Sequence, residues 1–196
     1  MKHTLLIVAS FLMLACAKED RMKGDTLFAQ KKYKEAIAAY NEYLELHPAH
    51  VKSLYNRGRS FEELKKFEKA TADFEKVLEI DQKNTSALLS MSEHSYRIKD
   101  YDQARYFAET VVKLNNELPL GFFWLGRAHH RLGQFNEALD AYNNAINLDR
   151  ELGEAYLFRG AIKMSGNRKK GACADFRTAK GLKVKDADAA LNKYCK

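Results

Sequence analysis

The sequence is poor in residues that interrupt helices. Its 196 residues include only two prolines and ten glycines, too few for the many tight turns of a strand-rich protein. Alanine, leucine, glutamate and lysine are frequent, and these residues favour helix. Hydrophobic residues make up 46% of the chain, which is enough for a sizeable core. The composition therefore predicts an all-α protein.

The sequence also lacks the short motifs of common catalytic and metal sites. It has no G-x-S-x-G, no H-E-x-x-H and no Walker sequence. His129 and His130 are adjacent on a predicted helix, so they point to different sides and cannot both bind one metal ion. The basic turn Gly166–Gly171 could attract a phosphate, but an exposed turn between helices explains it better. We expect no enzyme activity, no cofactor and no metal.

Positive charge is concentrated at the C-terminal end. The formal net charge is +7, and Gly166–Lys196 holds nine lysines and arginines against three aspartates. A solvated capping helix would account for this balance. The alternative is a docking patch for an anionic partner, such as a lipid headgroup or a cell-wall polymer. Nucleic acid is not an expected partner, because the N-terminus indicates export.

Small and aromatic residues recur with a step of 34 residues. One row is alanine throughout: Ala36, Ala70, Ala104, Ala138 and Ala172. A second is glycine or serine: Gly24, Gly58, Ser92, Gly126 and Gly160. A third is aromatic with one alanine: Tyr40, Phe74, Ala108, Tyr142 and Phe176. A fourth is aromatic until Lys169 ends it: Tyr33, Phe67, Tyr101 and Phe135. Rows that stay in phase over five periods indicate repeated helical hairpins.

This pattern resembles the tetratricopeptide repeat (TPR) family from Ala17 to Asp186. The resemblance implies a right-handed TPR solenoid of about five helical hairpins plus a C-terminal capping helix. The array occupies residues 21–186, with repeats one to five at about 17–50, 51–84, 85–118, 119–152 and 153–186, and the cap occupies residues 187–196. Three second helices should run over Tyr33–Leu46, Phe67–Ile80 and Tyr101–Leu114.

The small residues are expected where the two helices of a hairpin cross. Ala138 should therefore tolerate a larger side chain less well than Ala141. Asp186 should cap the closing helix at its N-terminus. Cys173 and Cys195 are expected to be neighbours, and in an oxidising compartment they could form a disulfide.

Residues 1–15 are expected to be a signal peptide. Lys2 and His3 precede the apolar run Leu5–Ala15, which is too short to span a bilayer, since that takes about 20 residues. Cys16 follows, which resembles the lipobox of bacterial lipoproteins and implies lipidation of Cys16 and a short tether over residues 16–20. The alternative is a secretory signal that is cleaved after Ala17. The periplasmic and the surface-exposed sides of the outer membrane both stay open.

The family lines its concave face with fixed positions of each first helix. Here those positions hold Tyr55, Arg59, Leu89, Glu93, Tyr96, Arg97, Phe123, Arg127, His130, Arg131 and Leu157. Aromatic and arginine side chains are frequent in binding hot spots. Phe123 and Leu157 would otherwise be exposed apolar residues. The carboxylate clamp of TPR modules that bind chaperone C-termini is absent, because other residues occupy its positions.

The resemblance implies a non-catalytic scaffold or adaptor for protein-protein interaction. We expect it to be anchored in the bacterial envelope as an outer-membrane lipoprotein, with a peptide or protein segment bound in the concave groove. The membrane is contacted through the lipid anchor, and neither nucleic acid nor metal is expected. The alternative is a structural subunit of an envelope or outer-membrane assembly complex that uses its edges and its basic C-terminal cap.

Overall fold

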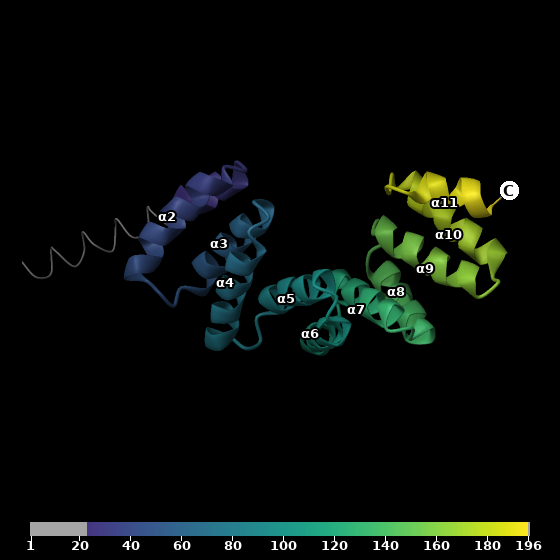
Figure 1. Cartoon of the computed structure of the whole chain (residues 1–196), viewed down its shortest axis with the longest axis horizontal. Coiled ribbons are helices and arrows are strands. Elements are labelled where there is room, and N and C mark those ends of the chain that lie inside the picture. The colour runs from purple at the N-terminus through teal and green to yellow at the C-terminus, as the bar shows by residue number, and fades with distance from the viewer. Residues whose placement is uncertain (1–22, 196) are drawn as a thin grey trace, which may run out of the picture. The chain divides into compact units, whose positions relative to one another are not determined.

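The computed structural model describes residues 23–195 of the chain. The predicted signal peptide and Cys16 lie outside these residues. All regular elements in the described part are helices (Figure 1), so the predicted all-α class is confirmed. None of the described helices has the length and apolarity to cross a membrane. The chain divides into two compact units, Met1–Ala87 and Leu88–Lys196, and we describe each by itself.

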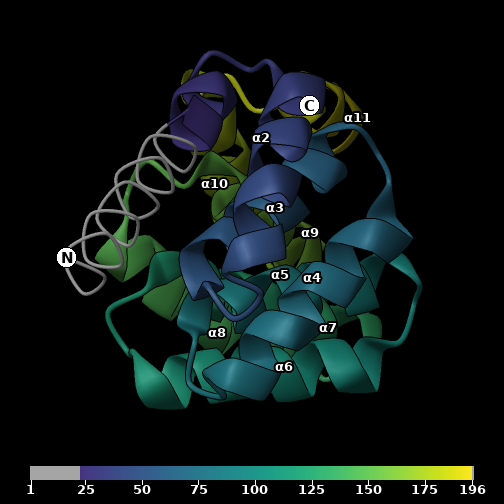
Figure 2. The same ribbon diagram turned by 90° about the vertical axis from the view of Figure 1, so that its left-hand side faces the viewer.

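The described part of the first unit consists of short consecutive helices (Figure 2). They are a helix over residues 23–29, α2 (Tyr33–Leu46), α3 (Val51–Glu63) and α4 (Phe67–Ile80). Helix α3 packs against both α2 and α4.

The second unit also consists of consecutive helices. They are α5 (Thr85–Arg97), whose first turn holds the boundary between the units, α6 (Tyr101–Leu114), α7 (Pro119–Arg131), α8 (Phe135–Leu148), α9 (Gly153–Ser165), α10 (Lys169–Gly181) and α11 (Ala187–Tyr194). From α6 onwards each helix packs on the next. Helices α2, α4 and α6 have the predicted bounds.

The turns inside the hairpins share a backbone conformation that the sequence did not reveal. Five residues at the 34-residue step have a left-handed φ between 56° and 77°: Lys31, Lys65, Lys99, Gly133 and Asn167. At Lys65 the turn is closed by two backbone bonds of 2.8 Å, from Lys65 to Glu62 and from Lys66 to Phe61, a common way to end a helix. Only Gly133 is a glycine, so only one of the five turns has the residue that usually indicates a left-handed conformation.

An aromatic ring packs directly over a glycine where the helices of most hairpins cross. A Cβ atom added to Gly58 would lie 2.6 Å from the Phe74 ring, and one added to Gly160 would lie 2.7 Å from the Phe176 ring. Gly24 and Gly126 have the same relation to Tyr40 and Tyr142. The glycine row therefore exists because the rings need the space of a missing side chain.

Repeat three fills the same crossing in another way. Ala108 replaces the ring and Ser92 replaces the glycine, and both are fully buried. The Ser92 hydroxyl donates a hydrogen bond of 2.8 Å to the carbonyl oxygen of Ala104. Each crossing thus pairs a glycine with an aromatic ring, or it pairs two small residues with each other.

We predict that Gly160→Ala destabilises the protein by about 1–3 kcal/mol, because the new methyl group overlaps the Phe176 ring. Gly181→Ala is the matched control, since a Cβ there would meet nothing within 4 Å and alanine favours helix. Thermal unfolding followed by circular dichroism compares the two variants. A Gly160→Ala protein that melts no lower than Gly181→Ala would contradict this packing.

Ala141 is more buried than its expected tolerance implied, and the comparison with Ala138 stays a prediction. Ala138 is fully buried, as its place at the crossing requires, but Ala141 is only 4% exposed. Its position faces the first helix of its own repeat. In repeats two and five the same position holds Asp73 and Asp175, which are buried against arginines of α3 and α9.

These buried aspartates form two ion pairs with matching geometry. The Arg57 guanidinium donates to both carboxylate oxygens of Asp73, at 2.8 and 2.6 Å, and to Asn41 Oδ1 at 2.9 Å. Arg159 binds Asp175 at 3.0 and 2.6 Å and Asn143 at 2.8 Å. Repeats three and four have apolar pairs at the arginine and aspartate positions: Met91 with Phe107, and Leu125 with Ala141. The fold therefore accepts either a paired charge or an apolar pair there.

We predict that Asp73→Ala costs about 3–5 kcal/mol of stability, because it leaves the Arg57 charge buried without a counter-ion. Adding Arg57→Leu should recover part of that loss, since the double variant then has the leucine and alanine that repeat four has at these two positions. Urea unfolding measures both free energies. A double variant less stable than Asp73→Ala alone would show that the two repeats are not interchangeable at this site.

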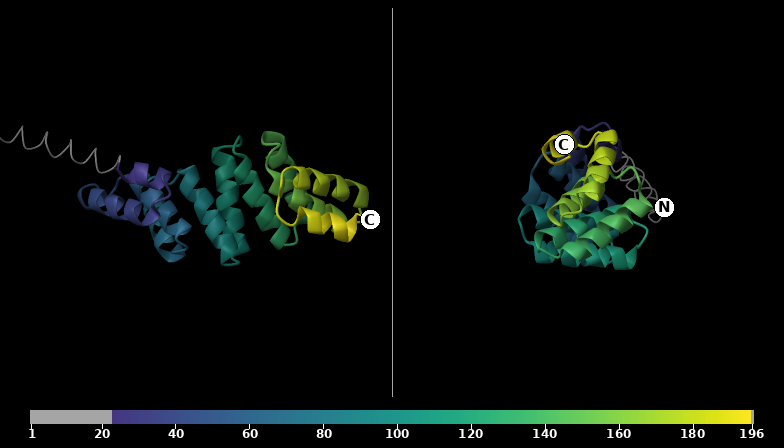
Figure 3. Two further views of the ribbon diagram at one scale, coloured as in Figure 1. Left: turned by 90° about the horizontal axis from the view of Figure 1, so that it is seen from above. Right: turned by 90° about the vertical axis from the view of Figure 1, so that its right-hand side faces the viewer.

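The C-terminal helix closes the second unit (Figure 3). Helix α11 packs on α10, and a disulfide joins Cys173 to Cys195, whose Cα atoms are 5.7 Å apart. Lys180 and Asp188 form an ion pair of 2.6 Å across the two helices. Asp186 does not cap α11 through its side chain, because its backbone is left-handed, with φ 72°, and its carboxylate makes no capping bond.

Candidate functional site

The predicted groove residues are distributed over both units. Tyr55 and Arg59 lie on α3 in the first unit. The others lie in the second unit: Leu89, Glu93, Tyr96 and Arg97 on α5, Phe123, Arg127, His130 and Arg131 on α7, and Leu157 on α9. The two sets are therefore treated separately.

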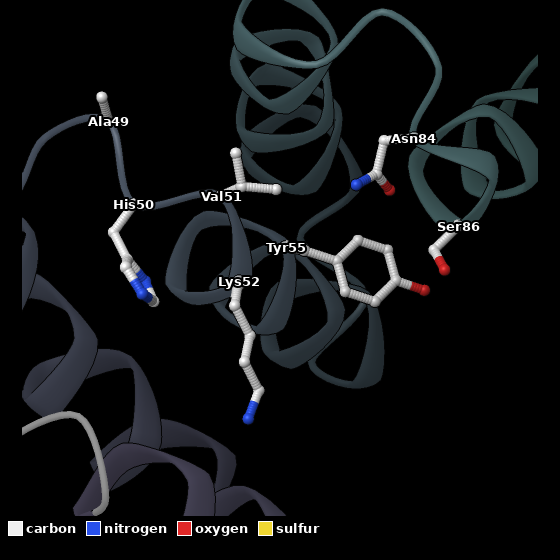
Figure 4. A pocket seen from close by; sticks show the side chains of 7 residues that line it. All are labelled: Ala49, His50, Val51, Lys52, Tyr55, Asn84 and Ser86. Atoms are coloured by element: carbon white, nitrogen blue, oxygen red, sulfur yellow. The ribbon is translucent and has the colours of Figure 1, made fainter.

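The first unit has an open hollow of about 460 Å³ beside Tyr55 (Figure 4). It is lined by Ala49, His50, Val51, Lys52, Tyr55, Asn84 and Ser86. The Tyr55 ring packs against Phe74 with 5.6 Å between centroids. Arg59 lies outside the lining and forms an ion pair of 2.9 Å with Glu62. Its charge is therefore already compensated within the helix.

One carboxylate of this unit binds three side-chain donors. Asp25 accepts hydrogen bonds from the Tyr40 hydroxyl at 2.9 Å, from Asn56 Nδ2 at 2.9 Å and from Lys52 Nζ at 2.8 Å. Partial burial acts to raise the pKa of Asp25, but the bonds from Lys52, Tyr40 and Asn56 outweigh it and hold that pKa below its usual value. The donors here are satisfied by the chain itself.

The second unit presents an arginine held between aromatic rings. The Arg127 guanidinium carbon lies 4.1 Å from the Phe158 ring centroid and 4.5 Å from that of Tyr96. Trp124 lies beside it at 5.5 Å, and Arg127 Nε donates to the Tyr96 hydroxyl at 3.3 Å. Such contacts hold a guanidinium in place and leave its outer nitrogens able to donate.

Two adjoining hollows of about 370 and 390 Å³ open beside this arginine. Both are lined by Tyr96, Tyr101 and Arg131, and Arg131 donates to the Tyr101 hydroxyl at 2.7 Å. We call this surface the Arg127 groove, defined by Tyr96, Tyr101, Trp124, Arg127, Arg131, Phe135 and Phe158. It combines aromatic surface with two cations, and the predicted groove residues Glu93, Arg97 and His130 also line these hollows, together with Lys99.

Glu93 lines the first hollow and only partly offsets the positive charge of the groove. Within residues 23–195, neither Arg127 nor Arg131 forms an ion pair with a carboxylate. His130 lies nearby, and its pKa is lowered by burial and by the charges of Arg127 and Arg131. No group of side chains in residues 23–195 could hold a metal ion. The groove therefore suits an anionic or acceptor-rich ligand.

Comparison with known proteins agrees with the repeat pattern. Two family models described as "Tetratricopeptide repeat" match residues 21–85 and 119–152. The chain carries tetratricopeptide repeats. No curated protein matches it.

Solved TPR structures share the fold. A fragment of MamA from Desulfovibrio magneticus RS-1 superposes with a TM-score of 0.76 and 22% identity, over 85% of this chain and 94% of that one. YrrB, described as "a TPR protein with an unusual peptide-binding site", has a TM-score of 0.70 and 19% identity, with 87% of each chain covered. At these identities the likeness concerns the TPR fold alone.

One of the predicted TPR groove residues lies in the core instead. Phe123 is 3% exposed, so the expectation that it lies open in the groove is wrong. Its ring packs against Tyr142 and Phe158, with centroids 6.2 and 6.1 Å away. Leu89 and Leu157 are half-buried and line neither hollow of the second unit.

Several groove residues were not predicted. Tyr101 and Phe135 stand at the starts of second helices, and Phe135 is 49% exposed. Both belong to an aromatic row that the sequence showed, but that row was given no role in binding. Trp124 and Phe158 share one position of the first helix, next to those that the family pattern marks. An aromatic pair at that position was the available signal.

We predict that the imidazole of His130 titrates below its ordinary pKa of 6.5. The unfolded chain takes up a proton on His130 near pH 6.5, while the folded chain does not. Neutral His130 therefore contributes to the free energy of unfolding above pH 6.5, and this contribution is lost as the pH falls below 6.5. NMR titration measures the pKa. Arg131→Gln should raise it and Lys193→Gln should leave it unchanged. A His130 pKa at or above 6.5 would contradict the burial of the ring.

Proposed function

We propose that this protein is a non-catalytic TPR scaffold that binds a segment of a partner protein in the Arg127 groove. TPR hairpins stack to build interaction surface, and the groove combines aromatic rings with two uncompensated guanidinium groups. Arginine and aromatic side chains are enriched among residues that dominate binding energy. The uncompensated, ring-held Arg127 is the observation on which the proposal rests.

The groove chemistry defines the segment that would bind. Tyr96, Trp124 and Phe135 offer apolar faces, while Arg127 and Arg131 offer forks that suit carboxylates. We infer an extended or helical segment with acidic and apolar side chains. The peptide-binding site named for YrrB supports a peptide ligand on this fold.

The partner can be captured by placing a photo-crosslinking phenylalanine analogue at Phe135. This ring is exposed and lines the groove, so its replacement should leave the core intact. The crosslinked protein, once purified, provides the ligand for affinity measurements on variants of the groove.

We predict that Arg127→Met weakens the captured partner's binding by about 1–3 kcal/mol. Methionine keeps an apolar side chain between Tyr96 and Phe158, so the melting temperature should change little. The comparison variant, Lys169→Glu with Lys170→Glu, should weaken binding less. If the variant with Lys169→Glu and Lys170→Glu abolishes binding and Arg127→Met leaves it intact, the groove is not the binding site.

That comparison also tests the second candidate function, a structural subunit that contacts partners through its basic cap. Basic side chains of the last hairpin and of its cap are exposed: Arg168, Lys169, Lys170, Arg177, Lys180, Lys183, Lys185 and Lys193. Only a few acidic groups accompany them, and Asp175 is already bound by Arg159 and Lys163. A partner with an acidic surface would suit this face.

We further propose that the scaffold is held in the bacterial envelope by a lipid on Cys16, as an outer-membrane lipoprotein on either the periplasmic or the surface-exposed side. The lipobox-like segment motivates the anchor. The disulfide between Cys173 and Cys195 is consistent with export, because disulfides persist in oxidising compartments.

We predict that cells fed a clickable fatty acid label the wild-type protein and a Cys173→Ser variant, but not Cys16→Ser. Lipidation requires the thiol of the first mature residue, so only the loss of Cys16 should abolish it. In-gel fluorescence after affinity purification reads the label. Undiminished labelling of Cys16→Ser, with continued membrane fractionation, would exclude this anchor.

A further inference from the structure

Repeats one and four each pack a tyrosine ring over a glycine, and the residue that follows this glycine differs between them. A Cβ added to Gly24 would lie 2.6 Å from the Tyr40 ring, and one added to Gly126 would lie 2.8 Å from the Tyr142 ring. In repeat one the hydroxyl reaches the next residue along the helix, Asp25, at 2.9 Å. The corresponding residue in repeat four is Arg127.

In repeat one the chain supplies the acceptor that these donors need. The Asp25 carboxylate accepts from Tyr40 and from Lys52 and Asn56 of the following repeat. An ionised carboxylate is a strong acceptor and binds several donors at once. The site in repeat one is therefore complete without a ligand.

In repeat four the acceptor is missing from the described part of the chain. Tyr142 is fully buried, and its hydroxyl has no hydrogen-bond partner among residues 23–195. Glu154, at the position of Lys52, is exposed and forms no ion pair with Arg127. The Arg127 guanidinium packs instead against the Phe158 and Tyr96 rings.

The neighbouring hydroxyls add to the surplus of donors. Tyr96 and Tyr101 accept bonds from Arg127 and Arg131, and neither hydroxyl donates its own proton to another described residue. Buried polar groups are nearly always paired in folded proteins, so an orphaned hydroxyl calls for an explanation. Two guanidinium groups and three phenol hydroxyls together suit an acceptor with several lone pairs.

We propose that the partner places a carboxylate between the Arg127 guanidinium and the Tyr142 hydroxyl, in the role that Asp25 has in repeat one. This inference rests on the proposed binding of a protein segment in the Arg127 groove. Because the hydroxyl is buried, Arg127 shifts as the carboxylate enters and exchanges its bond to Tyr96 for a fork on the ligand. Phosphate would suit the same donors, but the acceptor built into repeat one is a carboxylate.

The single tryptophan of the chain provides the measurement. Trp124 is the only tryptophan in the sequence and lies 5.5 Å from the Arg127 guanidinium, so its fluorescence reports directly on the groove. Three peptides of leucine and phenylalanine serve as probes for the full chain. One has a central glutamate and blocked ends, one has glutamine there and blocked ends, and one has glutamine and a free C-terminal carboxylate.

We expect the glutamate peptide to bind about tenfold more tightly than the blocked glutamine peptide, as a hydrogen-bonded charge implies. A similar gain for the peptide with the free C-terminus would show that a chain end can also supply the carboxylate, and no gain would restrict the subsite to an acidic side chain. Tyr142→Phe should remove most of the tenfold preference. Tyr40→Phe, the matched control, should lower the melting temperature and keep the preference.

Different outcomes separate this inference from the proposed function. Equal binding of the glutamate and glutamine peptides would overturn the carboxylate subsite and leave groove binding intact. A full tenfold preference in Tyr142→Phe would overturn the role of that hydroxyl. Displacement of the glutamate peptide by inorganic phosphate, but not by acetate, would reassign the subsite to phosphate. If no peptide changes Trp124 fluorescence and the captured partner binds Arg127→Met normally, both proposals fail.

Discussion

The packing of an aromatic ring over a glycine governs how closely the two helices of a hairpin approach. At Gly58 and Gly160 even one methyl group would overlap the ring of Phe74 or Phe176. Ser92 and Ala108 meet the same constraint with two small residues and one added hydrogen bond. A ring at this crossing thus stands only opposite a glycine, because a close-packed crossing has no room for an excess of volume.

This packing constraint also influences the chemistry of the groove. Phenylalanine and tyrosine fill the crossing equally well, but tyrosine carries a hydroxyl beyond the packed ring. At Tyr40 the hydroxyl meets Asp25, while at Tyr142 it stays without a partner among the described residues. Equivalent core positions can therefore be self-contained in one repeat and incomplete in another. The same holds for the arginine and aspartate pairs of repeats two and five, which apolar pairs replace in repeats three and four.

The sequence was most informative where size alone decides. The bounds of α2, α4 and α6 and the pairing of glycine with ring followed from rows of small and large residues. It was misleading where a position has different neighbours in different repeats. Phe123 has a position that the family exposes, yet its ring is enclosed by Tyr142 and Phe158. Ala141 is more buried than expected for a related reason, since its neighbour lies on the other helix of the hairpin.

The sequence by itself determined the period, the helices and the crossings, because these depend on side-chain size at a fixed spacing along one chain. Only the tertiary structure decided which polar groups find partners. Arg127 rests between rings from α5 and α9, and Lys65 adopts a left-handed turn without glycine's usual signal. These outcomes depend on atoms contributed by other helices and on backbone bonds that close a turn. Neither is encoded in the identity of a single residue.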